Sequence, residues 1–301
     1  MALEEQPPAE EVRHQMRERW GKAAGGWRER RAAGGRPSED VLTDTLLALA
    51  GIAPGQRVLD MACGAGNPAF AIAERVGPAG SVLGCDITPA MVETCREQAR
   101  EQGVANASFR LIEREVDLDV TAASFDAVTC RQALMFMPDP VAALDCWRRA
   151  LKPGGHAAVS TWGPAERCHF FNFPRQVLSR HLEVPVGERP GVGVNALTSP
   201  EALTDVLTAA GFVDVRTTVL EVPMMEVESP EAWWERVEAG RGPGADLLAG
   251  LSVERRRAAR EDAIARLREL FADGPVRLTN EAVVAAGTNP ADVGREGVDA
   301  R

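Results

Sequence analysis

Short apolar runs alternate with amphipathic stretches through the middle of the chain. The short runs are typical of strands that are buried on both faces of a sheet, and the longer stretches have the spacing of helices that bury one face. Strands that alternate with helices in this way predict a doubly wound α/β fold around a mostly parallel sheet. The predicted strands lie at 57–61, 81–86, 107–112, 125–130, 155–162, 213–222 and 276–287.

Capping residues support this division. A polar side chain followed by proline is a favoured start of a helix. Such pairs predict helix starts at Thr88-Pro89, Asp139-Pro140, Ser199-Pro200 and Ser229-Pro230. Two further helices are predicted before the first strand, one over the charged residues 11–33 and one capped by Ser38.

Two stretches do not follow the alternation of strands and helices. Residues 163–197 and 223–275 combine loop and helix patterns, which are typical of insertions that carry a binding function. The expected organisation begins with an N-terminal tail and cap helices at 1–55, a core at 56–162 and an insertion at 163–197. A helix with the sixth strand follows at 198–222, then a helical lid at 223–275, the last strand at 276–288 and a disordered tail at 289–301.

The first predicted strand leads into the most informative segment, VLDMACGAGNPAF. Asp60 ends the strand, Gly64 and Gly66 form a tight turn, and a helix begins at Pro68 or Ala69. Glycine lets the backbone approach a ligand closely, and the first amide groups of the helix point at that ligand together with the positive end of the helix dipole. The segment therefore predicts a turn that binds a nucleotide cofactor.

Two cofactors are compatible with this turn. It matches the dinucleotide pattern GxGxxA, and Asp86 follows at the end of the second strand, where a carboxylate can accept both ribose hydroxyls. Asp60 would repel a diphosphate at the mouth of the turn, and it suits the ammonium and sulfonium of S-adenosylmethionine better. The alternatives are an NAD-dependent oxidoreductase and a purely structural role for Asp60 as a turn or cap residue.

Four blocks resemble the class I S-adenosylmethionine-dependent methyltransferases and occur in the order found in that family. They are VLDMACGAG, VLGCDITPAM, SFDAVTCRQALMFMPDP and LKPGGHAAVSTWG. The segments AGFVDV and VRLTNEAVVAAG fit the same pattern, so the resemblance covers most of the chain. The subgroup that is most similar includes ubiquinone, menaquinone and bacterial natural-product methyltransferases. The resemblance implies a Rossmann-like, seven-stranded sheet with an antiparallel last strand.

The resemblance also implies contacts with S-adenosylmethionine. The methionine part is expected to contact Asp60, Ala62, Gly64 and Gly66, and the ribose is expected to contact Asp86. The adenine is expected to contact Ile87, Met91 and Glu113. Glu113 departs from the family pattern, because the segment LIEREVDLDV is one residue longer than usual. Arg131, directly after the fourth strand, is expected to contact the cofactor carboxylate or the substrate.

Methyl transfer from a sulfonium is an in-line displacement, in which alignment can supply roughly 7–11 kcal/mol of the barrier. No nucleophilic triad is visible, and His169 is the candidate general base, with a plain polar loop residue as the alternative. The expected substrate-binding residues are Trp20, Trp27, Gln132, Met135, Phe171 and Met225. They predict a hydrophobic or aromatic small molecule, methylated on oxygen or carbon. A non-methylating reaction such as a cyclisation is the alternative.

Charge and cysteine content narrow the range of partners. The net charge of −10 argues against nucleic acid, which requires a basic surface. The six cysteines contain no CxxC pair, so we expect no metal site and a reducing, cytoplasmic location. No apolar stretch reaches the roughly 18 residues of a membrane span. The expected partner is a small-molecule substrate, and a homodimer stays open.

Overall fold

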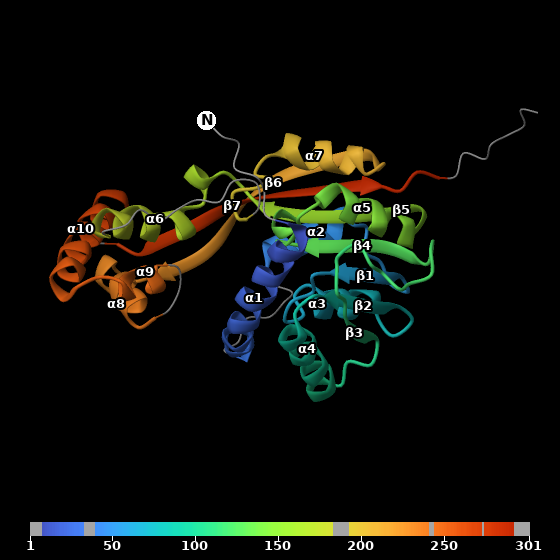
Figure 1. The fold of residues 1–301 in the computed structure, drawn as a ribbon, viewed down its shortest axis with the longest axis horizontal. Coiled ribbons are helices and arrows are strands. Elements are labelled where there is room, and N and C mark those ends of the chain that lie inside the picture. Colours follow the sequence, from blue (N-terminus) through green and yellow to red (C-terminus); the bar gives the residue numbers. More distant parts are fainter. Residues whose placement is uncertain (1–7, 33–39, 183–192, 241–243, 273, 292–301) are drawn as a thin grey trace, which may run out of the picture. The chain divides into compact units, whose positions relative to one another are not determined.

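The computed structural model describes residues 8–32, 40–182, 193–240, 244–272 and 274–291 (Figure 1). The chain forms two compact units. The first, called the sheet unit here, comprises Met1–Thr161, Gly191–Val219 and Val283–Arg301, and the second, called the helical unit, comprises Trp162–Pro190 and Leu220–Ala282. Each unit is formed from segments that are far apart in the sequence.

One seven-stranded sheet runs through the described chain in the order β3-β2-β1-β4-β5-β7-β6. Its strands are β1 Arg57–Met61, β2 Ser81–Asp86, β3 Ala107–Leu111, β4 Phe125–Arg131, β5 Leu151–Trp162, β6 Val213–Val227 and β7 Val276–Thr288. The pairs β1/β2, β1/β4, β2/β3 and β4/β5 are parallel. The strand order reverses between β1 and β4, and ligands of doubly wound folds bind at the carboxyl ends of the strands at such a point.

The last strand runs antiparallel to β5, as the resemblance implied. Asn289 N donates to Gly155 O at 2.8 Å, and Gly163 N donates to Glu281 O at 2.8 Å. The partner number in β7 therefore falls as the number in β5 rises, which identifies antiparallel pairing. The predicted seven-stranded, doubly wound fold is confirmed.

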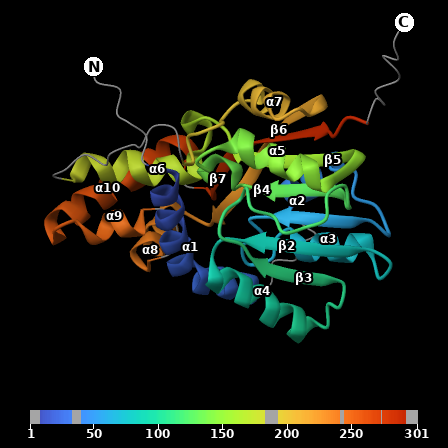
Figure 2. The ribbon, with the colours of Figure 1, turned by 45° about the vertical axis from the view of Figure 1, so that its right-hand side comes forward.

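Four helices begin at the proline that the capping signals predict, namely α4, α5, α7 and α8. In the sheet unit the helices are α1 Ala9–Ala32, α2 Val41–Leu49, α3 Ala69–Val76, α4 Pro89–Gln102, α5 Pro140–Ala150 and α7 Pro200–Ala209. In the helical unit they are α6 His169–Leu178, α8 Pro230–Glu238, α9 Ala245–Ala249 and α10 Val253–Phe271. Figure 2 shows α4 beside the edge strand β3, which it contacts. None of the described helices combines the length and hydrophobicity that crossing a bilayer requires.

The side chains at the helix starts confirm three of the five predicted caps, and Thr88 before α4 makes no capping hydrogen bond with its side chain. Asp139 Oδ1 accepts a hydrogen bond from Ala142 N at 2.9 Å, and the serines before α7 and α8 make equivalent bonds. The predicted cap of α2 was wrong. Asp40, not Ser38, accepts from Leu42 N at 3.0 Å, and Ser38 lies outside the described residues.

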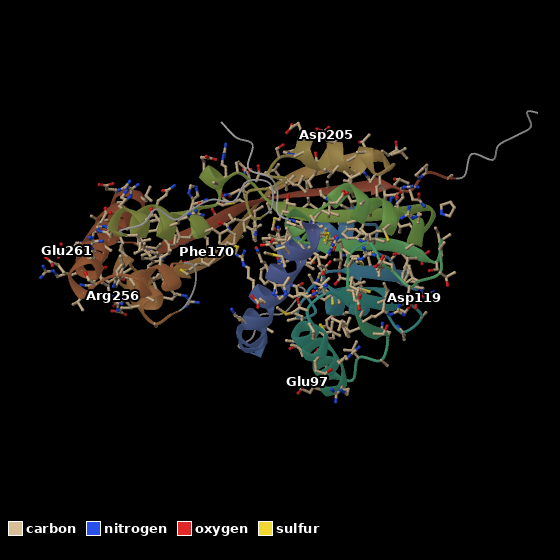
Figure 3. All side chains as sticks on the ribbon, in the orientation of Figure 1. Glu97, Asp119, Phe170, Asp205, Arg256 and Glu261 are labelled. Atoms are coloured by element: carbon tan, nitrogen blue, oxygen red, sulfur yellow. The ribbon has the colours of Figure 1, made fainter. Side chains whose placement is uncertain are left out.

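Each unit has a hydrophobic core of its own. In the sheet unit, Trp147 of α5 and Phe125 of β4 are fully buried against the sheet. In the helical unit, Trp233 and Trp234 of α8 are fully buried, and Phe173 meets Trp233 edge-on at 5.1 Å between ring centroids. Charged residues such as Asp205 of α7 and Glu261 of α10 are exposed on the surface of their own units (Figure 3). Burial therefore separates the apolar and charged faces in both units.

The two predicted insertions, 163–197 and 223–275, supply most of the helical unit. The helical unit also includes parts of β6 and β7, because both strands extend into it. The disordered tail was predicted to begin at residue 289, which is too early. Asn289 is buried, and its side-chain amide donates to Leu151 O at 3.0 Å. Residues 292–301 lie outside the described part of the chain.

Candidate cofactor site

The turn after β1 has a backbone that allows a close approach by a ligand. Ala62, Gly64 and Gly66 have φ angles of 55°, 53° and 93°, in the left-handed region that favours glycine. Ala62 is an alanine held in a sparsely populated conformation, which is common at functional sites. A Cβ added at Gly64 would meet no described atom within 4 Å. Conformation therefore requires the glycine, and open space lies beside its backbone.

Asp60 is fully buried at the end of β1. Its Oδ1 accepts a hydrogen bond of 2.7 Å from Thr129 Oγ1 on the neighbouring strand β4. Among the described residues, its Oδ2 has no hydrogen-bond partner. Burial raises the pKa of Asp60 to about 7, and the negative charge of Asp86 adds to the rise. Thr129, Arg131 and the backbone N–H of Ala69 at the start of α3 oppose it. An unpaired buried carboxylate oxygen is unfavourable in a protein interior, and a cationic donor would satisfy it.

Asp86 ends β2 and fixes the conformation of the turn. Its Oδ2 accepts a hydrogen bond from Gly64 N at 2.9 Å, and its Oδ1 accepts one from Thr88 N at 2.8 Å. Burial raises the pKa of Asp86, and these two hydrogen bonds oppose the rise. Each carboxylate oxygen has a second lone pair, so Asp86 can still accept hydrogen bonds from a ribose.

Arg131, at the end of β4, pairs with Asp40 at the start of α2. Its Nε is buried and has no partner within the described ranges. The hydroxyl of Thr43 lies 3.3 Å from Asp40 Oδ2 and 3.1 Å from Asn67 Oδ1. Asn67 belongs to the turn, so this network connects α2, the turn and β4. It also leaves one guanidinium donor available for an anionic group.

Gln132 follows Arg131 with a φ of 56°, which is unusual for a residue other than glycine. Its backbone N donates to Ser160 O at 3.0 Å, and its Nε2 donates to Thr161 O at 3.3 Å. Its Oε1 is buried without a partner in the part of the chain that the structure describes. Asp60, Arg131 and Gln132 therefore each bring one unsatisfied polar atom to the carboxyl ends of β1 and β4.

Comparison with known proteins identifies the family. The Methyltransferase domain family matches residues 52–182. Nocamycin O-methyltransferase from Saccharothrix syringae is 31% identical over 234 residues, which are 69% of this chain and 82% of that protein. The chain belongs to the S-adenosylmethionine-dependent methyltransferases. Aklanonic acid methyltransferase from Streptomyces sp. (strain C5) is 36% identical over 174 residues, which are 54% of this methyltransferase and 77% of that relative.

A solved structure shows the same fold. The YcgJ protein of Bacillus subtilis superimposes with a TM-score of 0.52 at 20% identity, covering 83% of this methyltransferase and 98% of that protein. The family decides between the two cofactors that the turn admits, in favour of S-adenosylmethionine. The unsatisfied Oδ2 of Asp60 and the open space beside Gly64 fit a cofactor with a cationic headgroup.

The structure brings Met91, one of the residues expected at the adenine, together with the turn. Met91 of α4 is buried in a cluster with Ala65 of the turn and with Ala24 and Trp20 of α1. Ile87 is half-buried at the edge of the main core. The side chain of Glu113 is exposed, and its carbonyl oxygen accepts a hydrogen bond from Arg17 of α1.

The remaining residues expected at the site fall in different places. Met135 is buried in the sheet unit, and its carbonyl accepts from Gly193 N at 2.9 Å. His169, Phe171 and Met225 belong to the helical unit. His169 is exposed at the start of α6, Phe171 packs edge-on against Trp162 at 5.3 Å, and Met225 packs on that unit's core. The side chain of Trp27 lies outside the described part of α1.

Sequence reasoning missed three polar residues that shape the site. Thr129 had a weak signal, since it is a hydroxyl between the apolar residues Val128 and Cys130. The structure places it opposite Asp60 in the register. Asp40 had a capping signal that was assigned to Ser38 instead. Glu115 had none, because it lies in a charged segment after β3 and yet is buried.

Proposed function

We propose that this methyltransferase methylates an oxygen or carbon atom of a hydrophobic or aromatic small molecule, such as a quinone-like compound or a secondary metabolite. The cofactor part of the proposal depends above all on Asp60, whose buried Oδ2 has no partner among the described residues. The substrate class is supported by the relatives, which are named for nocamycin and aklanonic acid.

When bound, S-adenosylmethionine supplies a methyl group already activated by a positively charged sulfur. We assign the ammonium of its methionine part to Asp60 and the carboxylate to Arg131, whose Nε is an unused donor in the described structure. Asp86 is assigned to the ribose hydroxyls. Ala62, Gly64, Gly66, Ile87, Met91 and Glu113 keep the roles that the family resemblance implies.

The chain's contribution to the reaction is mainly alignment. Gln132 projects a buried, unpaired acceptor from the end of β4, and a substrate hydroxyl is a suitable donor for it. Trp20, Met135, Phe171 and Met225 keep the substrate-binding roles that the sequence predicts. His169 is exposed and is proposed as the general base, because a histidine can accept a proton near neutral pH.

Two measurements test the proposal. Calorimetric titration should show binding of S-adenosylmethionine and S-adenosylhomocysteine and no binding of NAD. Incubation with S-adenosylmethionine and a panel of hydrophobic phenols, quinols and polyketide acids should yield a product whose mass has increased by one methyl group in place of hydrogen. Methylation of polar amines or peptides, with no turnover of the hydrophobic panel, would contradict the proposed substrate class.

The proposed roles of single residues need variants with matched controls. Asp60→Asn should weaken cofactor binding, whereas Asp44→Asn, which changes an exposed carboxylate on α2, should not. His169→Ala should lower kcat and leave cofactor affinity unchanged if His169 is the base. Unchanged kcat in that variant over the whole pH range would remove His169 from the mechanism.

A further inference from the structure

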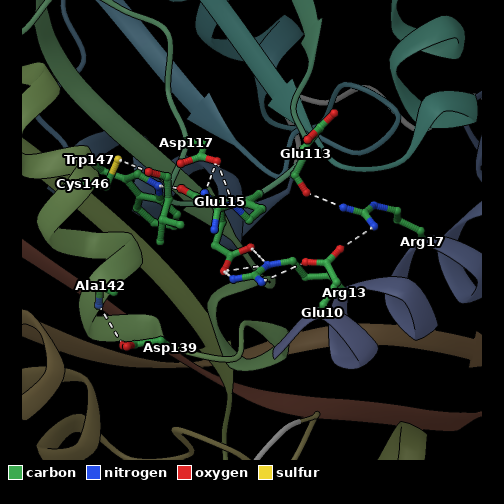
Figure 4. Close-up of polar contacts among 12 residues, drawn as sticks. Glu10, Arg13, Arg17, Glu113, Glu115, Asp117, Asp139, Ala142, Cys146 and Trp147 are labelled. Atoms are coloured by element: carbon green, nitrogen blue, oxygen red, sulfur yellow. Dashed lines mark hydrogen bonds and ion pairs between the residues drawn. The ribbon is translucent and has the colours of Figure 1, made fainter. Parts of the chain in front are cut away.

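Helix α1 is fastened to the sheet unit by a buried ion pair. Arg13 Nη2 lies 2.6 Å from Glu115 Oε1, and Arg13 Nε lies 2.9 Å from Glu115 Oε2 (Figure 4). The side chains of these two residues are only 9% and 5% exposed. Separating the two charges without exposing them to water would be strongly destabilising, because each would then be an unpaired buried charge.

The loop that carries Glu115 is also hydrogen-bonded to α5. Trp147 Nε1 of α5 donates to Glu115 O at 2.9 Å. Arg17, one turn after Arg13, donates to the carbonyl of Glu113 and pairs with Glu10 at 3.3 Å (Figure 4). Hydrogen bonds from α1 and α5 therefore hold the segment after β3 that binds the Arg13 guanidinium.

The same helix covers the cofactor turn further along its length. Trp20 and Ala24 pack on Ala65 of the turn and on Met91 of α4. Trp20 also meets Phe136 edge-on, with 5.6 Å between ring centroids. Ala65 lies between the two glycines assigned to the methionine part of the cofactor, and Met91 is assigned to the adenine. Helix α1 thus packs against a cluster that includes a residue from each wall of the proposed cofactor site.

Few of the described side chains of α1 are buried, although the helix also packs along α4. Its sequence, AEEVRHQMRERWGKAAGGWRERRA, is mainly charged and polar, and Val12, Arg13 and Ala24 are its only buried side chains among those described. Its glycines lower its helix propensity further. A helix of this composition depends on tertiary contacts for its stability, so loss of a few contacts should release it.

We propose that α1 is a cap on the cofactor site, that Arg13 and Glu115 are its latch, and that Trp20 contacts the bound cofactor. Release of the latch then limits how fast S-adenosylmethionine enters and S-adenosylhomocysteine leaves. The inference depends on the proposed placement of the cofactor at the Gly64 turn. In it, Trp20 is a binding residue, and Arg13 is a positioning residue that acts through Glu115.

The test measures the release rate of S-adenosylhomocysteine by stopped-flow displacement. Arg13→Met keeps the apolar stem and removes the charge, and Glu115→Gln removes the opposite charge. Each should speed release by about tenfold or more, equivalent to about 1.4 kcal/mol or more. Lys22→Met, which removes an exposed cation from the same helix, is the matched control and should leave the release rate unchanged.

A charge-reversed pair separates a latch from general destabilisation. Arg13→Glu combined with Glu115→Arg should restore slow release at least in part, whereas either reversal alone should not. Hydrogen exchange of the amides of α1 should rise in the single variants and return toward the wild-type level in the pair. A latch variant that fails to fold is replaced by Trp20→Leu, which leaves the ion pair intact and should also speed release.

Two outcomes would overturn the inference. One is release at the wild-type rate from folded Arg13→Met, Glu115→Gln and Trp20→Leu variants. The other is an equal increase of the release rate in the Lys22→Met control. Failure of the proposed function would look different, because the wild-type protein itself would then bind no S-adenosylhomocysteine and Asp60→Asn would change nothing.

Discussion

Replacing Asp60 with asparagine should stabilise the ligand-free protein and at the same time weaken cofactor binding. Asparagine keeps the shape of the side chain and an oxygen that can accept the 2.7 Å hydrogen bond from Thr129 Oγ1. It removes the charge and puts an uncharged amide NH2 group in the place of the unpaired Oδ2. One variant therefore measures both the cost of the buried carboxylate to the fold and its contribution to binding.

The size of the stability effect follows from the pKa of Asp60. Burial raises this pKa to about 7 from its ordinary value of 3.8, so the folded state holds the proton more tightly than the unfolded chain does. The stability that this proton contributes is complete below a pH of about 3.8 and is lost as the pH rises through about 7. One pKa unit corresponds to about 1.4 kcal/mol. The ionised carboxylate therefore lowers the free energy of unfolding by up to about 4 kcal/mol above neutral pH.

Thermal unfolding without cofactor measures the first effect. Above neutral pH the Asp60→Asn variant should melt several degrees higher than the wild type, and the difference should shrink as the pH falls from about 7 toward 4. Calorimetric titration measures the second effect. Wild-type affinity for S-adenosylhomocysteine should fall by up to about tenfold per pH unit below pH 7, because Asp60 must then lose a proton to receive the ammonium.

The variant should bind S-adenosylhomocysteine about 10- to 100-fold more weakly than the wild type above pH 7, which is the usual worth of a hydrogen bond to a charged group. Its affinity should also lose the decline that Asp60 causes at low pH. A variant that melts below the wild type at high pH would show that the carboxylate is not an unpaired buried charge. Unchanged affinity would show that this oxygen does not meet the cofactor.

Three further predictions concern stability and reactivity. Thr129→Val removes the hydrogen bond to Asp60, so it should raise the pKa of that carboxyl further and move the fall in cofactor affinity to higher pH. Calorimetry at several pH values measures this shift, and an unshifted profile would contradict the prediction. Leu267→Ala truncates a fully buried residue of the helical unit and should lower the free energy of unfolding of that unit by about 2–5 kcal/mol. Hydrogen exchange should then become faster in α8 and α10, with the amides of β1 and β4 as the internal control. Cys146 is the half-buried cysteine among six otherwise buried ones, so a thiol reagent added to the native protein should label it first, and peptide mapping that finds Cys63 or Cys95 labelled earlier would refute the burial described here.

Local rules account for the parts of the fold that were predicted well, and their exceptions have local causes. β5 begins at Leu151 and not at 155, because Leu151 pairs with Phe125 ahead of an irregularity in the register, and the intervening residues look like a turn in the sequence. β6 continues past Pro223 to Val227. Proline is tolerated there because β6 is an edge strand, where a missing backbone donor leaves no ladder bond unmade.

Long-range polar pairs could not be predicted in the same way. Arg13 and Glu115 are separated by 102 positions, and Arg131 and Asp40 by 91. Charged residues are usually exposed, so Arg13, Glu115 and Asp40 look like surface residues until their partners are known. The contacts that attach α1 and α2 to the sheet unit therefore come from the tertiary structure alone.

Asp60 shows why a site can be located from sequence while its chemistry cannot. Its place at the end of β1 follows from a local pattern of strand, glycine turn and helix. Its unpaired oxygen and raised pKa follow from the register with Thr129, from burial and from the proximity of Asp86. These features make the fold less stable, so rules that seek the most stable arrangement would not place an unpaired carboxylate there. That conflict between stability and charge is the physical reason to expect a cationic ligand at this position, and it is the conflict that Asp60→Asn would remove.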